Sequence, residues 1–405
     1  MNVIDYIRWR GDLSFKTDPF NDVDNLVFAQ FIYAEFWNVL QESDKITIGE
    51  LHKRFFRKFE GKAEEAKTFG KEGIMVLDAM GQADRFKDCV VYNYVNKLHA
   101  DTTEQFTAIM VDLPDRTTVV CFKGTDEHMI GWKEDAYLSY KDIASQMDAV
   151  EYVNDHCSPL KKYRLLGHSK GGHLAVYAAV HCKPLLRNSI IQIISDDGPG
   201  LREGTYPPDV YDKIKDKYHL IVPEKDGVGT IYEMAPNKTI ARILTKNIVE
   251  AHNIFAWQIM GKSIQKADTD SYMTDRTRKA IVQFLKETTP EQREIFVEEM
   301  FKAFDDAKIT TVTQMAHGGL PVIFRVIKEL SEMDGVAKST AVKLAKTFSI
   351  SISSNLHKAV TEKKESFVSK ASGISSNIGS FIDGYKNRKK DDDTEEESQE
   401  KVEGN

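Results

Sequence analysis

The feature that most constrains this sequence is a short apolar run that leads directly into a glycine-flanked serine. Tyr163–Leu166 has the composition of a strand, Gly167-His168-Ser169-Lys170-Gly171 follows at once, and Gly172–His181 has the small and apolar residues of a buried helix. Glycines two positions before and after the serine let the backbone turn sharply from strand to helix. The segment therefore predicts a serine hydroxyl at the edge of a sheet, beside a helix N-terminus that favours a developing oxyanion.

The segments around this turn alternate between strand and helix patterns. Residues 1–105 read as mixed loops and helices, with Phe28–Leu40 apolar enough for a buried helix. Helical patterns then cover Ala136–His156 and Gly172–His181. The β-rich runs are Phe106–Leu113, Thr117–Phe122, Tyr163–Leu166, Ile190–Ser195 and Tyr218–Val222. This alternation predicts an α/β fold whose largely parallel sheet has helices on both faces.

After about residue 268 the strand pattern fades. Thr289-Pro290-Glu291-Gln292 predicts a helix start, with Thr as the N-cap and Pro at the first helical position. Ser339–Phe381 is an amphipathic, Lys-containing stretch, for which a solvated bundle helix is favoured over contact with a membrane surface. We expect an α/β domain over residues 1–268, a helical region over 269–385 and a charged, disordered tail over 386–405.

The net charge of −7 arises at the end of the chain. Eight acids and one base lie between Asp391 and Asn405, so the other 390 residues carry 54 basic and 54 acidic side chains. This neutral body lacks the basic footprint of nucleic-acid binding proteins, and no nucleic-acid partner is expected.

The expected location rests on what the sequence does not contain. It has no run of about 18 apolar residues, and its start lacks the basic-then-apolar layout of a signal peptide. The four cysteines (Cys89, Cys121, Cys157 and Cys182) are scattered, which fits free thiols in a reducing compartment. We expect a cytoplasmic protein, with secretion without a cleavable signal peptide as the alternative.

A serine nucleophile needs a base, and the base needs an acid to orient it. In doubly wound hydrolases these residues follow in the chain order serine, acid, histidine. His252 fits the base, because it is the only histidine between His219 and His317 and because His219 lies within a strand run.

For the acid we favour Asp226, in the glycine-containing loop after the strand run that ends at Val222. Glu224 in the same loop is the second choice. Asp196 and Asp197, which end the preceding strand run, are a further alternative.

The oxyanion needs two backbone amides. One is expected from Lys170, the residue after the nucleophile, and the other from a loop after an earlier strand. The Thr117–Phe122 run ends in such a loop, where Gly124 permits a turn and Thr125 presents its N–H.

Six short motifs occur in order along the chain. They are F-K-G-T-D (Phe122–Asp126), G-W-K-E-D (Gly131–Asp135), G-H-S-K-G-G (Gly167–Gly172), D-G-P-G (Asp197–Gly200), E-K-D-G-V (Glu224–Val228) and H-N-I-F-A-W (His252–Trp257). Together with the opening Tyr6–Asp12, they resemble the fungal-type, or class 3, lipase family, and more closely its bacterial, Mbeg-like subgroup. The resemblance covers about residues 1–260.

This resemblance implies an α/β-hydrolase fold, a Ser169–Asp226–His252 triad and hydrolysis of carboxylic esters, usually of lipids. Two residues depart from the lipase pattern: Lys123 stands where Arg is usual, and Lys170 replaces the common Leu. A charged residue at the elbow is unusual beside an apolar triacylglycerol pocket.

We therefore expect a serine hydrolase that cleaves lipid, phospholipid or small carboxylic esters through an acyl-enzyme. We also expect transient contact with a membrane surface, and neither a cofactor nor a metal ion. One alternative is a non-catalytic lipase-like scaffold whose C-terminal helices bind a protein partner. Another is an exported lipase toxin that uses those helices for targeting.

Overall fold

The structure is a computed structural model that describes residues 1–36, 39–58, 68–225, 228–245, 248–267, 272–312, 314, 335–341 and 343. The chain divides into two compact units, Met1–Thr347 and Phe348–Asn405. All of the described residues lie in the first unit.

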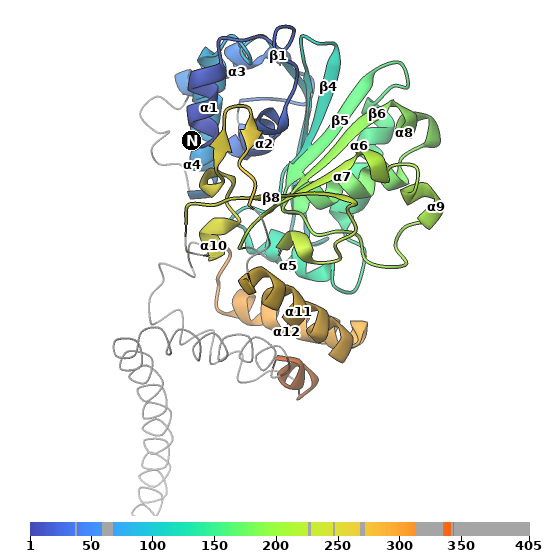
Figure 1. The fold of residues 1–405 in the computed structure, drawn as a ribbon. Helices are drawn as coiled ribbons and strands as arrows, with labels where there is room; N and C mark the ends of the chain where they lie inside the picture. Colours follow the sequence, from blue (N-terminus) through green and yellow to red (C-terminus); the bar gives the residue numbers. More distant parts are fainter. Residues whose placement is uncertain are drawn as a thin grey trace, which may run out of the picture. The chain divides into compact units, whose positions relative to one another are not determined.

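An eight-stranded sheet forms the centre of this unit, and its strands lie side by side in chain order (Figure 1). The strands are β1 (Lys45–Thr47), β2 (Val90–His99), β3 (Glu104–Asp112), β4 (Thr117–Phe122), β5 (Lys162–His168), β6 (Ile190–Asp196), β7 (Tyr218–Pro223) and β8 (Asn237–Ala241). Strands β1 to β4 pair antiparallel, and β4 to β8 pair parallel. A separate hairpin joins β9 (Ile259–Met260) to β10 (Ser263–Ile264).

Helices cover both faces of the sheet. The α-helices are α1 (Val3–Arg10), α2 (Asp22–Phe31), α3 (Ile48–Lys58), α4 (Thr68–Gln82), α5 (Met129–Tyr137), α6 (Ala144–His156), α7 (Lys170–His181), α8 (Pro184–Ser189), α9 (Pro208–Tyr211), α10 (Ile248–Ala251), α11 (Tyr272–Glu287) and α12 (Pro290–Asp306). The 3₁₀ helices are η1 (Ile32–Ala34), η4 (Lys215–Lys217), η5 (Val228–Thr230) and η6 (Ile254–Ala256). Among the helices with described residues, none combines the length and apolar character that a bilayer crossing requires.

Alternation along the strands divides the core into two halves. Val119 and Cys121 of β4 belong to the cluster formed with α1 to α4, whereas Val120 and Phe122 belong to the cluster formed with α6 and α7. These two helix layers lie on opposite sides of the sheet (Figure 1). Because successive side chains of a strand point to opposite faces, the continuous apolar runs of β4 to β7 are those of a sheet buried on both sides.

The expected α/β-hydrolase fold is confirmed, and the five predicted strands are present with ends that differ by at most two residues. Several details differ from the sequence analysis. The helical pattern of Phe28–Leu40 covers the end of α2 and the 3₁₀ helix η1, after which Glu35 has a left-handed φ of 54°. Strands β1 and β8 were not predicted. Strand β2 lies in a region expected to hold only loops and helices, and it contains an irregularity between Tyr92 and Val95, with Asn93 at a φ of 52°. The helical pattern of Ala136–His156 comprises the last turn of α5 and all of α6.

The helical region also begins as expected. Thr289 caps α12, accepting a hydrogen bond from Gln292 N, and Pro290 is its first residue. Val297 and Phe301 of α12 pack with Met129 and Tyr137 of α5 in a third core cluster. The compact unit therefore extends past the boundary expected at residue 268. Most of Ser339–Phe381 and all of the tail 386–405 lie outside the described residues.

Candidate active site

Strand β5 and helix α7 meet at a sharp turn on Ser169. Its φ of 57° and ψ of −128° lie outside the helix and strand regions, a strained conformation of the kind that functional sites retain. A Cβ atom on Gly171 would collide with the carbonyl oxygen of Phe122, and one on Gly167 would lie 2.5 Å from the same atom. The two glycines therefore let β5 and α7 approach β4 closely, as the motif predicts.

The imidazole of His252 lies against a buried carboxylate. Its Nδ1 is 2.7 Å from Oδ2 of Asp197, which is completely buried. The other oxygen of Asp197 accepts a hydrogen bond of 2.8 Å from the backbone N–H of Gly229. Asp197 follows β6 directly and has a φ of 52°. Both carboxylate oxygens are thus held, which fixes the orientation of the carboxylate toward His252.

Backbone and side-chain contacts bring the segment of Ser169 next to those of Asp197 and His252. Nε2 of His168 lies 2.8 Å from the carbonyl oxygen of His252, and Nδ1 lies 3.2 Å from the hydroxyl of Tyr33. Since a carbonyl only accepts, His168 donates through Nε2 and accepts at Nδ1. Ser169 N donates to the carbonyl of Asp196 at 2.8 Å. His168 therefore lines the turn as a positioning residue.

The other acids considered from the sequence have different positions. Asp226 lies outside the described residues. Oε1 of Glu224 accepts a hydrogen bond of 3.2 Å from Ile243 N. Asp196 faces the side-chain amide of Asn25 at 2.7 Å, and burial raises its pKa well above the usual range. Among the described carboxylates, Asp197 is the one that contacts His252, although the sequence analysis ranked it below Asp226.

The loop after β4 lies against the nucleophile turn. A Cβ atom on Gly124 would be 3.2 Å from Cβ of Ser169, so the following residue, Thr125, is close to the site. The hydroxyl of Thr125 donates a hydrogen bond of 2.6 Å to Asp135, whose pKa is raised to about 6 by burial, against the opposing charge of Lys170. This side-chain contact holds the loop whose Thr125 N–H is expected to be the second amide, beside that of Lys170.

The side chain of Lys170 points into the protein. Its Nζ donates to Oε2 of Glu134 at 2.7 Å and to the carbonyl of Gln105 at 2.9 Å, and both charged side chains are at most 1% exposed. Lys123 likewise forms a buried ion pair, with Asp126 at 2.9 Å. The two lysines that depart from the lipase pattern therefore pair with acids inside the fold.

The loop after β4 is also bonded to the segment that follows α12. Met129 N donates to the carbonyl of Thr310, and Val312 N donates to the carbonyl of Glu127, both at 2.9 Å. These two bonds flank an antiparallel bridge between His128 and Thr311. The sequence analysis did not predict this contact, because a two-bond bridge has no strand pattern of its own.

No cluster of three or more His, Cys, Asp or Glu side chains suited to a metal ion occurs in the described part of the chain.

Comparisons with known proteins give one family, and the distant structural likenesses include two lipases. The chain is similar to M37 lipase, with 16% identity over 50% of this chain and 68% of that one, and a TM-score of 0.33. It is also similar to a fungal lipase solved with an inhibitor, with 12% identity over 62% of this chain and 94% of that one, and a TM-score of 0.34. No curated protein matches the chain. The sequence model of the Mbeg1-like family matches residues 80–302, more than half of the chain and a span that includes the serine turn, the Asp197–His252 pair and most of α12. The chain therefore belongs to the Mbeg1-like family.

Proposed function

We propose that this protein is a serine hydrolase that cleaves carboxylic esters, with Ser169 as the nucleophile, His252 as the general base and Asp197 as the acid. The observation that carries the proposal is the 2.7 Å contact between His252 and the buried carboxylate of Asp197, beside a serine held at a strained strand-to-helix turn. The order Ser169, Asp197, His252 is the chain order of doubly wound hydrolases. Asp226 would fit the same chain order, so we assign the acid to Asp197 because its buried carboxylate contacts His252.

In this mechanism, Nδ1–H of His252 donates to Asp197, and Nε2 is the ring nitrogen that accepts the proton of the Ser169 hydroxyl. The serine oxygen attacks the ester carbonyl, and the amides of Thr125 and Lys170 stabilise the oxyanion. His252 returns the proton to the departing alcohol, and an acyl-enzyme remains. Water then attacks the acyl carbon by the same proton transfers and releases the acid.

An acyl lipid is the substrate class that we favour, on the basis of the lipase-like motifs. The side-chain contacts are consistent with this choice. Because Nζ of Lys170 pairs with Glu134 inside the fold, the lysine at the elbow does not place an unpaired charge beside the ester. An apolar acyl chain can therefore approach Ser169 without desolvating an ammonium group.

Labelling with a fluorophosphonate, followed by turnover of short and long acyl esters, tests the proposal. The wild type should be labelled, and Ser169→Ala should lose both labelling and turnover. Asp197→Asn should reduce turnover by about four orders of magnitude, as loss of the orienting acid does in such triads. Asp226→Asn is the matched comparison and should have a small effect.

Each alternative has its own outcome in this experiment. If Asp226→Asn is the damaging change and Asp197→Asn is active, the acid is Asp226. If folded wild type is not labelled and hydrolyses none of the esters, the non-catalytic scaffold is the better description.

A further inference from the structure

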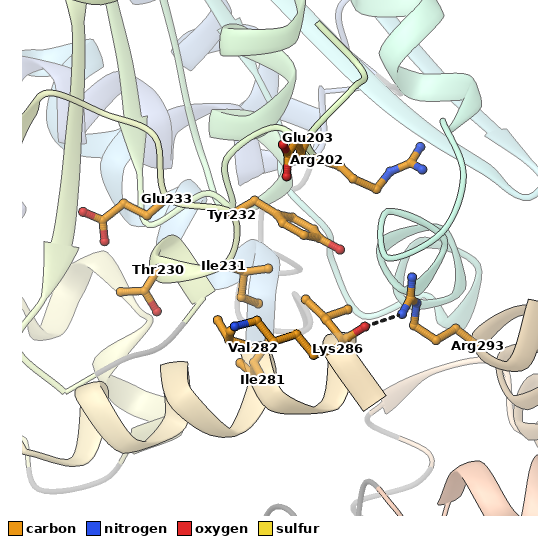
Figure 2. A pocket seen from close by; sticks show the side chains of 11 residues that line it. Arg202, Glu203, Thr230, Ile231, Tyr232, Glu233, Ile281, Val282, Lys286 and Arg293 are labelled. Carbon is orange, nitrogen blue, oxygen red and sulfur yellow. Dashed lines mark hydrogen bonds between the residues drawn. The ribbon is translucent and has the colours of Figure 1, made fainter. Parts of the chain in front are cut away.

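A cavity lies between the loops after β6 and β7 and the two C-terminal helices. Its volume is about 630 Å³, within the range of small-molecule sites. Arg202 and Tyr232 come from the loops, Ile281 and Leu285 from α11, and Arg293 from α12. Figure 2 shows the ring of Tyr232 directed toward the side on which the two guanidinium groups lie.

Arg293 brings a positive charge to this cavity, and Glu291, two residues before it, attracts that charge. The residue is only 7% exposed, and its Nη1 donates to the carbonyl oxygens of Leu285 and Thr288, at 3.0 and 2.6 Å. Its Nε is buried without a hydrogen-bond partner, and among the described residues no Asp or Glu forms an ion pair with Arg293. A buried cation of this kind is costly unless an anion joins it.

A second guanidinium adds to this charge. Arg202 lies at the same cavity, where its own ion pair with Asp142 (3.0 Å) is partly exposed. Burial lowers the pKa of Arg293, and the positive charge of Arg202 lowers it further. Tyr232 has the opposite effect on this pKa. Because both guanidinium groups line the cavity, an anion bound there would be attracted by both.

The acids at the cavity do not cancel these charges. Glu233 forms an ion pair with Lys238 at 3.1 Å, and Glu203 is exposed to solvent. The rest of the wall has an apolar part, formed by Ile231, Ile281 and Leu285, and also contains Thr230 and a further cation, Lys286. The cavity therefore combines a cationic end with an apolar surface.

We propose that this cavity binds a single-chain amphiphile with an anionic head, a carboxylate or a phosphate. The head would lie between Arg202 and Arg293, and the chain would lie along Ile231, Ile281 and Leu285. The hydroxyl of Tyr232, which donates a long hydrogen bond of 3.5 Å to the carbonyl of Ser139, would donate to the head instead. Guanidinium groups suit both heads, because their paired N–H donors match carboxylate and phosphate oxygens. The binding does not depend on the proposed hydrolysis, since none of these residues belongs to the triad.

Calorimetric titration of the full-length Ser169→Ala protein tests this proposal without turnover. Dodecanoate and dodecyl phosphate should bind, and dodecyltrimethylammonium should bind at least tenfold more weakly. Arg202→Gln should weaken the binding of both anions about tenfold or more, since a hydrogen bond to a charged group is worth roughly 1.5–3 kcal/mol. Arg116→Gln, at an exposed arginine that is not part of the cavity, should change nothing.

Three results would overturn the proposal. The first is equal affinity for the cationic amphiphile, which would indicate a purely apolar site. The second is unchanged affinity in Arg202→Gln, with Tyr232→Phe also unchanged, which would place the ligand elsewhere. The third is inorganic phosphate binding as tightly as dodecyl phosphate, which would exclude a role for the chain. Arg293 is left intact in these tests, because its bonds to Leu285 and Thr288 connect α11 to α12.

Discussion

Substitution of Lys170 by Met should destabilise the fold through the carboxylate that it leaves behind. Glu134 is completely buried, and loss of the lysine removes its counter-charge at 2.7 Å. Breaking one side of a buried ion pair costs about 3–5 kcal/mol. Glu134 would still accept hydrogen bonds from Gln105 N (3.1 Å) and from the amide and hydroxyl of Ser145 (3.1 and 2.6 Å). We therefore expect the lower part of this range, about 3 kcal/mol.

Urea unfolding followed by tryptophan fluorescence measures this loss. The double variant Lys170→Met/Glu134→Gln removes both charges and should recover part of the stability. The amide oxygen can still accept the two bonds from Ser145, although the NH2 group cannot accept the bond from Gln105 N. Lys161→Met is the control. Its ion pair with Asp112 is at the surface, with the lysine 47% exposed, and its loss should cost under about 1 kcal/mol. A loss in Lys170→Met no larger than in this control, or a double variant no more stable than the single one, would refute the reasoning.

Two further predictions concern acid stability and the C-terminal helices. Burial lowers the pKa of His173 to about 4, so between about pH 6.5 and 4 the unfolded chain binds a proton that the native protein does not. The free energy of unfolding should therefore fall by about 3 kcal/mol as pH decreases through that window. Urea unfolding at pH 7 and at pH 4.5 measures this difference in unfolding free energy, which should be much smaller in His173→Gln. A chain ending at Thr347 should stay folded and keep fluorophosphonate labelling. A chain ending at Thr288 lacks α12 and exposes the face of α5 that α12 covers, so it should lose solubility or labelling. If this shorter chain is soluble and fully labelled, α12 is dispensable.

The central sheet was predictable from the sequence because its strands are buried on both faces. Val119–Phe122 and Leu165–Leu166 are runs of buried apolar residues, and glycines lie on both sides of Ser169. The sequence pattern therefore predicts both the strands and the turn that the structure contains. Strand β2 was missed for the opposite reason. Its side chains are mostly half-buried or exposed, and the irregularity at Asn93 breaks the alternation on which strand prediction relies.

The partner of His252 was harder to predict, because several acids end neighbouring strands. Asp196 and Asp197 are adjacent in sequence, yet one faces Asn25 and the other His252. What separates them is the positive φ of Asp197, which redirects the chain as β6 ends, together with the N–H of Gly229 from the next loop. Neither feature can be deduced from residue type, although the following Gly198 was a signal that the chain turns there.

The bridge between His128 and Thr311 also has a consequence for the order of events during synthesis. The chain is made from its N-terminus, so the Glu127 carbonyl and the Met129 amide leave the ribosome long before Thr310 and Val312, their partners. Closing so long a loop is a late and entropically costly step. We therefore expect a nascent chain to hold a complete nucleophile turn while the neighbouring loop is still unanchored, so that full reactivity arises only after the segment beyond α12 has emerged.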